Sequence, residues 1–170
     1  NDVVPSAIHI ADREGAAELV TALEGLHAAL TAKAAELSSV IKLGRTHLQD
    51  AVPMTLGQEI SGWAGQIRKG IERVRGCYPR LEELALGGTA VGTGLNAHPE
   101  LAARAIARIA RATGIPFRRA DNAFEAMAAR DAQAELMGAL SVLAGSLLRI
   151  GNDLRLLASG PRGALGEIVL

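Results

Sequence analysis

The chain has 170 residues, and its 18 basic and 18 acidic side chains give a formal net charge of zero at pH 7. This balance and an aromatic content of 2% argue against a nucleic-acid-binding protein, which needs a basic face or aromatic stacking platforms. A single cysteine excludes an intrachain disulfide framework, and no apolar run reaches the roughly 18 residues of a membrane span. The length suits one domain with its own core.

The first predicted element is a long helix over residues 5–43. Pro5 suits a helix start, where its missing N–H is not needed, and Gly44 is a plausible stop. Apolar residues recur at a heptad-like spacing along it, which predicts one buried stripe. The stripe consists of Leu19, Leu23, Leu26, Leu30, Leu37 and Ile41.

Residues 44–55 break this period and predict a polar loop closed by Pro53. Apolar residues then recur every three or four positions over residues 56–84, which predicts a second long helix. Pro79 lies inside that helix and predicts a kink or a break there.

A glycine-rich segment, residues 87–98, precedes a shorter helix that is predicted over about residues 99–112 and ended by Gly114. Asn122 with Glu125 three residues later resembles a capping box at the start of a third long helix. Its stripe is regular, and Gly160-Pro161 should end the helix. The stripe residues are Leu136, Leu140, Leu143, Leu147, Ile150, Leu154 and Leu157.

No strand alternation stands out, so the predicted fold class is all-α, with three long helices in a slender bundle. The helices carry many glycines, which destabilise a helix by roughly 0.5–1 kcal/mol each relative to alanine. Their presence therefore predicts close helix packing, including packing against other subunits. These glycines are Gly62, Gly65, Gly70, Gly138, Gly145 and Gly151.

The predicted loop at residues 44–55 carries the densest chemistry. It offers a cation, a hydroxyl, an imidazole, an amide and a carboxylate, which could bind a small anion and move a proton near neutral pH. The alternative is an ordinary loop whose polar groups cap helices and meet water. These side chains are Arg45, Thr46, His47, Gln49 and Asp50.

Glycines in the segment 87–98 could let backbone N–H groups approach a phosphate. However, the segment lacks the P-loop order, and it follows a helix where a dinucleotide fingerprint needs a strand. A tight turn between helices is the favoured interpretation.

The remaining reactive side chains are scattered, and no His, Asp or Glu cluster has metal-ligand spacing. His9 and His27 are expected to pack or to lie at the surface, and His98 to cap a helix. Cys77 and Trp63 are expected in the core.

Two long motifs carry a resemblance to a known family. Residues 44–59 read GRTHLQDAVPMTLGQE and residues 86–96 read LGGTAVGTGLN, and both resemble signature segments of class II fumarate hydratases. Shorter segments match in order along the chain: Asn1-Asp2-Val3 with Pro5, residues 152–155, residues 159–162 and residues 166–168.

Two alternatives remain open beside this resemblance. Aspartate ammonia-lyases, a sister family, usually read GRTQ in the first motif and have alanine at the second glycine of the other, so His47 and Gly88 favour the fumarase. The third interpretation is a non-catalytic helical oligomerisation module.

The resemblance implies an all-helical protein whose long helices form the central bundle of a homotetramer, with each active site shared between subunits. It implies reversible hydration of fumarate, a C4 dicarboxylate, to L-malate in the tricarboxylic acid cycle, without a metal or an organic cofactor. Such enzymes lie in the cytoplasm, or in the mitochondrial matrix of eukaryotes. No nucleic-acid or membrane partner is implied.

Three residues match the family's site. His47 matches the histidine assigned to proton transfer, and Asn1 and Thr46 match groups that hydrogen-bond a substrate carboxylate. Scaffolding roles are favoured for Arg45, Gln49, Asp50, Thr93 and Asn96.

The resemblance also indicates that residues 1–170 form a central helical-bundle domain cut from a longer protein. The family's other site segments would precede Asn1 or follow Leu170, including a mobile loop whose serine is favoured as the base that removes the C3 proton of malate. The isolated chain is therefore expected not to hydrate fumarate.

Overall fold

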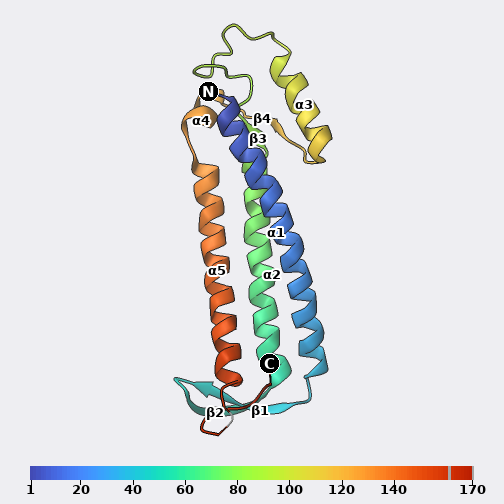
Figure 1. Ribbon diagram of the computed structural model, residues 1–170, viewed down its shortest axis with the longest axis vertical. Coiled ribbons are helices and arrows are strands. Elements are labelled where there is room, and N and C mark those ends of the chain that lie inside the picture. Colours follow the sequence, from blue (N-terminus) through green and yellow to red (C-terminus); the bar gives the residue numbers. More distant parts are fainter. Residues whose placement is uncertain (161, 170) are drawn as a thin grey trace. The chain divides into compact units, whose positions relative to one another are not determined.

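The computed structural model describes residues 1–160 and 162–169. Long helices dominate it, which confirms the predicted helical fold class (Figure 1). The helices are α1 (Val3–Glu36), α2 (Leu56–Leu81), α3 (Leu101–Thr113), α4 (Ala123–Ala128) and α5 (Asp131–Leu157). The strands are β1 (Ile41–Thr46), β2 (Gln49–Thr55), β3 (Glu83–Leu84) and β4 (Arg118–Arg119).

The chain folds as two compact units. The first unit comprises Asn1–Val20 and Arg73–Gly138, and the second comprises Thr21–Glu72 and Ala139–Leu170. Helices α1, α2 and α5 each continue from one unit into the other.

In the second unit, parts of α1, α2 and α5 pack around buried apolar side chains. Two glycines on α2 allow close approach within the chain. Of the six glycines predicted to do so, only Gly70 does, and the other five have nothing within 4 Å of a Cβ position. Gly57, which was not among the six, lies so close to α1 that a Cβ there would be 2.3 Å from the Ala34 carbonyl oxygen. A Cβ on Gly70 would lie 2.8 Å from the Leu143 side chain of α5. The buried apolar residues include Leu23, Leu56, Ile60, Trp63, Ala64, Ile67, Ile71, Leu143, Ile150 and Leu157.

In the first unit, the chain segment after α2 is held against α3. Strands β3 and β4 pair in parallel, with Glu83 opposite Arg118 and Leu84 opposite Arg119. Leu84, Ile106 and Phe117 form one buried cluster, which fixes α3 against this short ladder.

The predicted helix 5–43 is wrong at its C-terminal end, because α1 stops at Glu36 and a turn follows. Ser38 and Ser39 lie in that turn, where hydroxyl side chains compete with helical hydrogen bonds. Val40 and Ile41 come next, and β-branched residues favour extended backbone. The residues after the turn enter β1.

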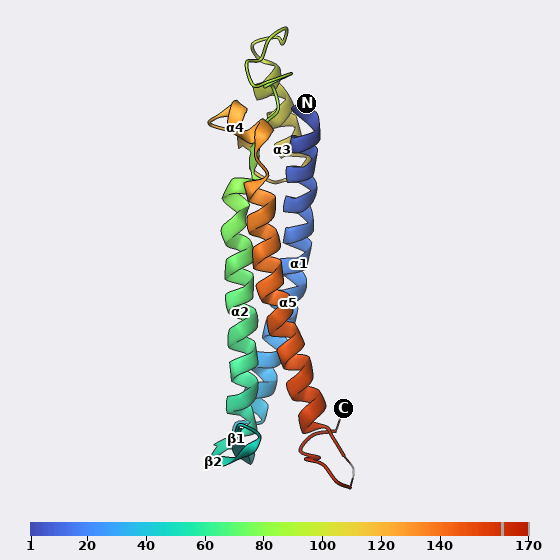
Figure 2. The same ribbon diagram turned by 90° about the vertical axis from the view of Figure 1, so that its left-hand side faces the viewer.

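The predicted loop at residues 44–55 and the expected absence of strands are also wrong. β1 and β2 form an antiparallel hairpin, which Figures 1 and 2 show beside the helix ends of the second unit. Gly44 is not a helix stop: it lies in β1 at a register shift, and a Cβ there would come 2.7 Å from the Val52 carbonyl oxygen.

Pro79 neither breaks nor ends α2, which continues through it to Leu81. A proline this close to the end of a helix removes a backbone hydrogen bond only in the last turn. Downstream, Gly114 caps α3 in the left-handed conformation, with φ 71°, as predicted.

Asn122 does cap a helix, because its side chain accepts hydrogen bonds from the backbone N–H groups of Phe124 and Glu125. That helix is the six-residue α4, however, and α5 begins separately at Asp131. α5 ends at Leu157, just before Gly160, and Pro161 lies outside the described residues.

Along α5, the predicted stripe is buried at four of its seven positions, intermediate at Leu140 and Leu154, and exposed at one. Leu136, Leu143, Ile150 and Leu157 are buried, whereas Leu147 is 38% exposed. Among the described residues, α5 is also long and apolar enough to cross a membrane by length and composition alone, and 17% of that window is buried. Helical bundles contain helices of the same composition, so the expectation that nothing spans a membrane stays a prediction.

Leu143 and Leu147 both belong to the predicted apolar stripe of α5, but only Leu143 is buried within the chain, so substituting each tests whether burial determines the stabilising effect. Leu143→Ala removes a buried side chain and should lower the free energy of unfolding by about 2–5 kcal/mol. Leu147→Ala should lower it much less in a monomeric sample. Urea unfolding followed by circular dichroism checks this, and equal losses for the two variants would contradict the burial pattern.

Candidate active site

The hairpin of the second unit places the sequence-predicted histidine at its tip. Thr46 pairs with Gln49, so His47 and Leu48 are the two turn residues, and their φ angles are 53° and 60°. Two consecutive positive φ values define a turn that strongly prefers Asn-Gly, because other side chains are strained there.

This strained tip points outward. Thr46 and His47 are exposed, and Leu48 is 74% exposed. In the alternative interpretation, the polar residues of this segment cap a helix. At the start of α2, Thr55 and Gln58 do this instead: the Thr55 hydroxyl accepts from the Gln58 N–H, and the Gln58 side chain accepts from the Thr55 N–H. The His47 imidazole and the Thr46 hydroxyl therefore lie at the surface, where they are not part of a packed core.

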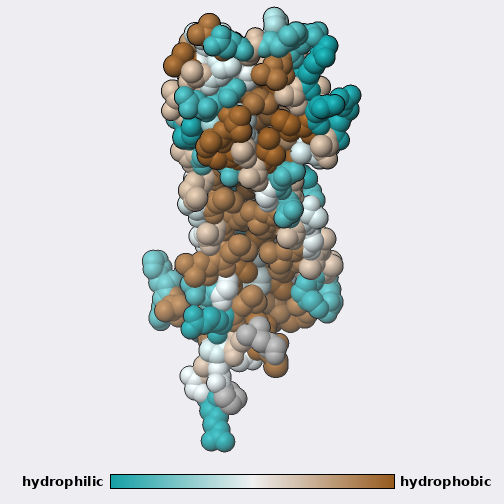
Figure 3. All heavy atoms as spheres, turned by 45° about the horizontal axis from the view of Figure 1, so that its top comes forward, coloured by the Kyte–Doolittle hydropathy of each residue, from teal (hydrophilic) through white to brown (hydrophobic). Residues whose placement is uncertain are grey.

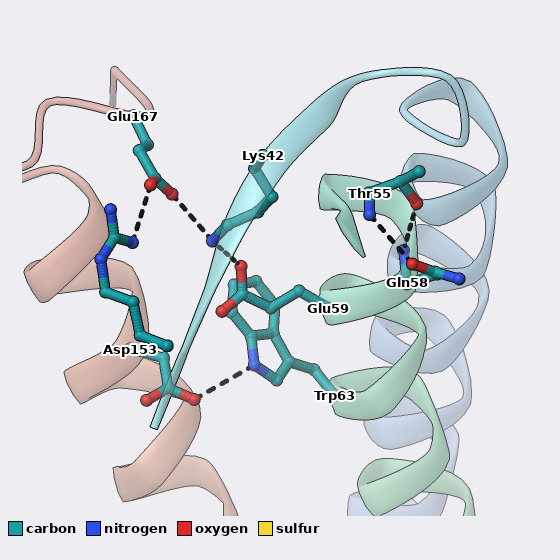
Figure 4. A network of polar contacts seen from close by, with 8 residues as sticks. Lys42, Thr55, Gln58, Glu59, Trp63, Asp153 and Glu167 are labelled. Carbon is teal, nitrogen blue, oxygen red and sulfur yellow. Dashed lines mark hydrogen bonds and ion pairs between the residues drawn. The ribbon is translucent and has the colours of Figure 1, made fainter. Parts of the chain in front are cut away.

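A cluster of ion pairs lies at the base of the hairpin, formed by Lys42, Arg45, Glu59 and Glu167. Figure 4 shows Lys42 between the carboxylates of Glu59 and Glu167. Lys42 pairs with Glu59 at the start of α2 and, at 2.7 Å, with Glu167 of the C-terminal segment. Arg45 pairs with Glu167 at 2.7 Å. We call these four residues the base cluster.

The base cluster is largely withdrawn from water, and the Lys42 side chain is only 7% exposed. Burial alone would raise the pKa of Glu167, but hydrogen bonds and charges from Lys42 and Arg45 outweigh it and hold that pKa below its ordinary value. Burial would lower the pKa of Lys42, and its two carboxylate partners raise it instead. Lys42 and Glu167 are therefore both charged near neutral pH.

An open cavity of about 380 Å³ lies between this hairpin and α5 within the second unit. Its polar lining comes from Lys42, Arg45, His47, Glu59, Arg149 and Asp153. On its α5 side, Asp153 accepts a hydrogen bond from the indole N–H of Trp63 at 3.2 Å (Figure 4). Each of its three cations is paired with a carboxylate, Arg149 with Asp153 at 3.8 Å, and His47 supplies a group that can exchange a proton.

Larger cavities lie in the first unit, but their linings offer less chemistry. One of about 850 Å³ runs along α3 beside Arg104, Arg108 and Arg111. Another, of about 540 Å³, is lined in part by Asn1 and Asp2.

The glycine-rich segment folds around the first two residues of the chain. The Asn1 side-chain amide donates to the Ala90 carbonyl oxygen at 2.9 Å. The buried carboxylate of Asp2 accepts from the N–H groups of Gly87 and Thr89 at 2.7 and 3.2 Å. Burial would raise the pKa of Asp2, and these two hydrogen bonds lower it below its ordinary value.

These contacts explain the glycines without a phosphate. Gly87 has a φ of 97°, and a Cβ there would lie 2.5 Å from the Ala102 Cβ. Gly92 has a φ of 111°, and a Cβ there would lie 2.7 Å from the Phe124 ring. The segment is thus a tight turn, as predicted, and its Gly87 and Thr89 N–H groups donate to Asp2.

The structure brings Thr46 and His47 together at one tip in the second unit, whereas Asn1 belongs to the first unit. The ion pair of Arg45 with Glu167 fits its expected scaffolding role. Gln49 and Asp50 are exposed in β2. In the glycine-rich segment, Thr93 is exposed at the turn, and Asn96 has a φ of 65°.

Most of the scattered side chains take the expected places, and His9 is buried beside the Leu81 carbonyl oxygen. His98 is not the predicted helix cap: the N-cap of α3 is Glu100, which makes no side-chain cap hydrogen bond and whose N–H donates to the His98 ring. Cys77 and Trp63 are buried. Among residues 1–160 and 162–169, no group of three or more His, Cys, Asp or Glu could hold a metal ion.

Asp2, Lys42, Glu59 and Glu167 were not predicted as site residues. Lys42 and Arg45 are three positions apart, a spacing that in a regular strand puts side chains on opposite faces. The ladder is irregular between Leu43 and Arg45, where Gly44 of β1 faces the two residues Ala51 and Val52 of β2, and both cations contact Glu167. Gly44 was the available signal, because a glycine inside a strand often marks a bulge.

Long helices, with a hairpin beside their ends whose strained tip carries an exposed histidine, define a mostly helical scaffold. A family model described as "Lyase" matches residues 1–170. The chain is 56% identical to a class II fumarate hydratase of Methylorubrum extorquens over 171 residues, covering all of this chain and 36% of that protein. It is 53% identical to a mitochondrial fumarate hydratase of Rattus norvegicus, covering all of this chain and 34% of that protein.

Two solved structures agree with the fold. A class II fumarase of Schistosoma mansoni superposes with a TM-score of 0.93 at 36% identity, over 96% of this chain and 38% of that one. A fumarate lyase:delta crystallin of Brucella melitensis superposes with a TM-score of 0.92 at 43% identity, over all of this chain and 37% of that one. The chain belongs to this lyase family, and it spans about a third of the length of these relatives.

The Asp2 contacts predict an acid-sensitive contribution to stability. Because the pKa of Asp2 lies below the ordinary value of 3.8, its contribution is present above about pH 3.8 and is lost as the pH falls further. Asp2→Asn should lower the free energy of unfolding near neutral pH by about 1–3 kcal/mol, since a charged acceptor is lost.

Urea unfolding near pH 7 and pH 3 checks this expectation. The difference between the original chain and Asp2→Asn should shrink at the lower pH. Asp121→Asn, which changes an exposed carboxylate of the same unit, serves as the control. An Asp2→Asn effect that is equal at both pH values would contradict the role of the charge.

Proposed function

We propose that the complete protein is a fumarate hydratase, which adds water to fumarate to give L-malate and catalyses the reverse reaction. The observation that carries this proposal is the strained tip: His47 and the adjacent Thr46 stand exposed at the turn of the GRTH motif. The relatives of 52–56% identity named fumarate hydratases support it.

The proposed roles follow the chemistry of each side chain. Thr46 and Asn1 donate hydrogen bonds to a substrate carboxylate, and His47 transfers a proton. In the dehydration direction, a base takes the C3 proton, the C2–O bond breaks and hydroxide leaves with acid help, so that fumarate and water result. The demand on the site is to stabilise the extra negative charge on the carboxylate, which calls for fixed donors rather than a strong nucleophile.

We also propose that the protein is a homotetramer with active sites shared between subunits. On α5, Val142, Leu148 and Leu156 are 50%, 67% and 41% exposed, and Gly145 and Gly151 have open space at the Cβ position. Figure 3 shows a broad apolar area on the helical face that it presents. Helices of other subunits would cover this surface, as in a bundle core. A sample that stays monomeric in light scattering would argue against this assembly.

Asn1 and His47 belong to different units of one chain. In an active site shared between subunits, Asn1 of one subunit and His47 of another would line the same site. The proposed reaction requires no metal or organic cofactor, and the proposed location is the cytoplasm or the mitochondrial matrix. The partners are limited to the dicarboxylate substrate and other copies of the chain, and the isolated 170-residue chain is expected to be inactive.

The activity prediction is tested on the complete protein with fumarate and L-aspartate as separate substrates. Fumarate should be consumed with formation of L-malate, and L-aspartate should release no ammonia. Ammonia release would instead support the aspartate ammonia-lyase alternative. A tetramer that acts on neither substrate would support the non-catalytic module.

Substitution of His47 separates chemistry from structure. Asn tolerates positive φ better than His, so His47→Asn should keep the hairpin and the assembly intact. Turnover should fall by about 10²–10⁴-fold, the usual contribution of a general acid or base. Steady-state kinetics and light scattering check this, and a change in turnover within about twofold would make His47 structural.

A further inference from the structure

The base cluster joins three parts of the second unit that are far apart in the sequence. Lys42 and Arg45 lie in β1, Glu59 lies in the first turns of α2, and Glu167 lies after α5. Glu167 is the member that contacts both cations of the hairpin: Lys42 at one carboxylate oxygen and Arg45 at the other.

The C-terminal segment is folded so that it presents this carboxylate to β1. The Glu167 N–H donates to the Leu157 carbonyl oxygen at 2.9 Å, and the Gly166 N–H donates to the Ser159 carbonyl oxygen at 2.7 Å. Gly166 has a φ of 56°, which favours glycine over a residue with a side chain. The turn therefore fixes Glu167 against the end of α5.

The hairpin tip has little packing of its own. Leu48 is 74% exposed, and both turn residues have positive φ, so the tip cannot be placed by burial. Arg45 immediately precedes Thr46 and His47, and its guanidinium ends on Glu167. The direction of the last residues of β1 thus depends on the base cluster.

Burial makes this dependence strong. The side chains of Lys42 and Glu167 are 7% and 19% exposed. Exposed ion pairs contribute little because water screens them, whereas loss of one partner of a buried pair leaves an uncompensated charge. The pair of Arg68 and Glu72 on α2, with side chains 52% and 58% exposed, is the exposed counterpart.

We propose that Glu167 is a positioning residue, which holds Thr46 and His47 in their working geometry through Lys42 and Arg45. This inference rests on the proposed function for its kinetic consequence. Its structural consequence, a hairpin fixed by the C-terminal segment, is measurable without any substrate.

The test uses Glu167→Gln in the complete protein. Turnover of fumarate should fall by about ten- to a hundredfold, as expected when a catalytic group is misplaced by about 1 Å. Amide hydrogen exchange should become faster over residues 41–55 and stay unchanged over residues 101–113 of the first unit. Glu72→Gln, in the exposed pair, should change neither turnover nor exchange.

Lys42→Met provides a second route to the same contact. If both residues act through one contact, the double variant Lys42→Met/Glu167→Gln should be little worse than the worse single variant. Should Glu167→Gln fail to fold, Glu167→Asp keeps the charge but shortens its reach, and the same two measurements apply with a smaller change.

Each result has one meaning for the proposal. Faster exchange over residues 41–55 together with reduced turnover supports it. Unchanged exchange there, a uniform increase over the whole chain, or loosening without loss of turnover would overturn it. If the original protein does not hydrate fumarate, the proposed function fails, whereas unchanged exchange over residues 41–55 in Glu167→Gln is a failure of the positioning role alone.

Discussion

The contact of Glu167 with Lys42 and Arg45 is the constraint on which the arrangement of the second unit's reactive residues depends. The hairpin is short, its tip is exposed and its turn is strained, so apolar burial gives it no fixed direction. Charges with low exposure supply that direction instead, because the partly buried carboxylate of Glu167 pairs with Lys42 at one oxygen and with Arg45 at the other. The same contact ties β1 to the turn that follows α5.

In each unit, a carboxylate orders a segment that has little core of its own, but the groups that it binds differ. In the second unit, a carboxylate far along the chain holds a strand through side-chain cations. In the first unit, the carboxylate of Asp2 holds the glycine-rich segment through the backbone N–H groups of Gly87 and Thr89. In both cases the acidic group has low exposure, since Asp2 is buried and Glu167 is partly buried. The pKa of each carboxylate is held below its ordinary value, so each remains charged near neutral pH.

The three long helices and α3 could be predicted from the sequence because each contains a local period of apolar residues, whereas the short α4 was not separated from α5. The hairpin could not be predicted, because its turn has His47 and Leu48 where Asn-Gly would give a signal, and its bulge at Gly44 disturbs the strand alternation. Thr46 and His47 were identified as site residues from the resemblance of the GRTH motif to the family, whereas the positioning role of Glu167 was not predicted. Its role depends on a contact across more than 100 positions of sequence, which no local spacing encodes. The Thr55–Gln58 capping box was within reach of local reasoning, since the T-x-x-Q spacing is its usual signature.

The strain at the tip and the rigidity of its base belong together. Positive φ at two residues with side chains is unfavourable, and the turn could relax if the strands beneath it were free to shift register. The bulge at Gly44 and the ion pairs at Lys42 and Arg45 oppose that shift, because sliding by one residue would turn both cations away from Glu167. A strained tip on a fixed base keeps an imidazole and a hydroxyl exposed in one orientation. That combination explains why the residues that hold the hairpin are charged and withdrawn from water, while those that it presents are exposed.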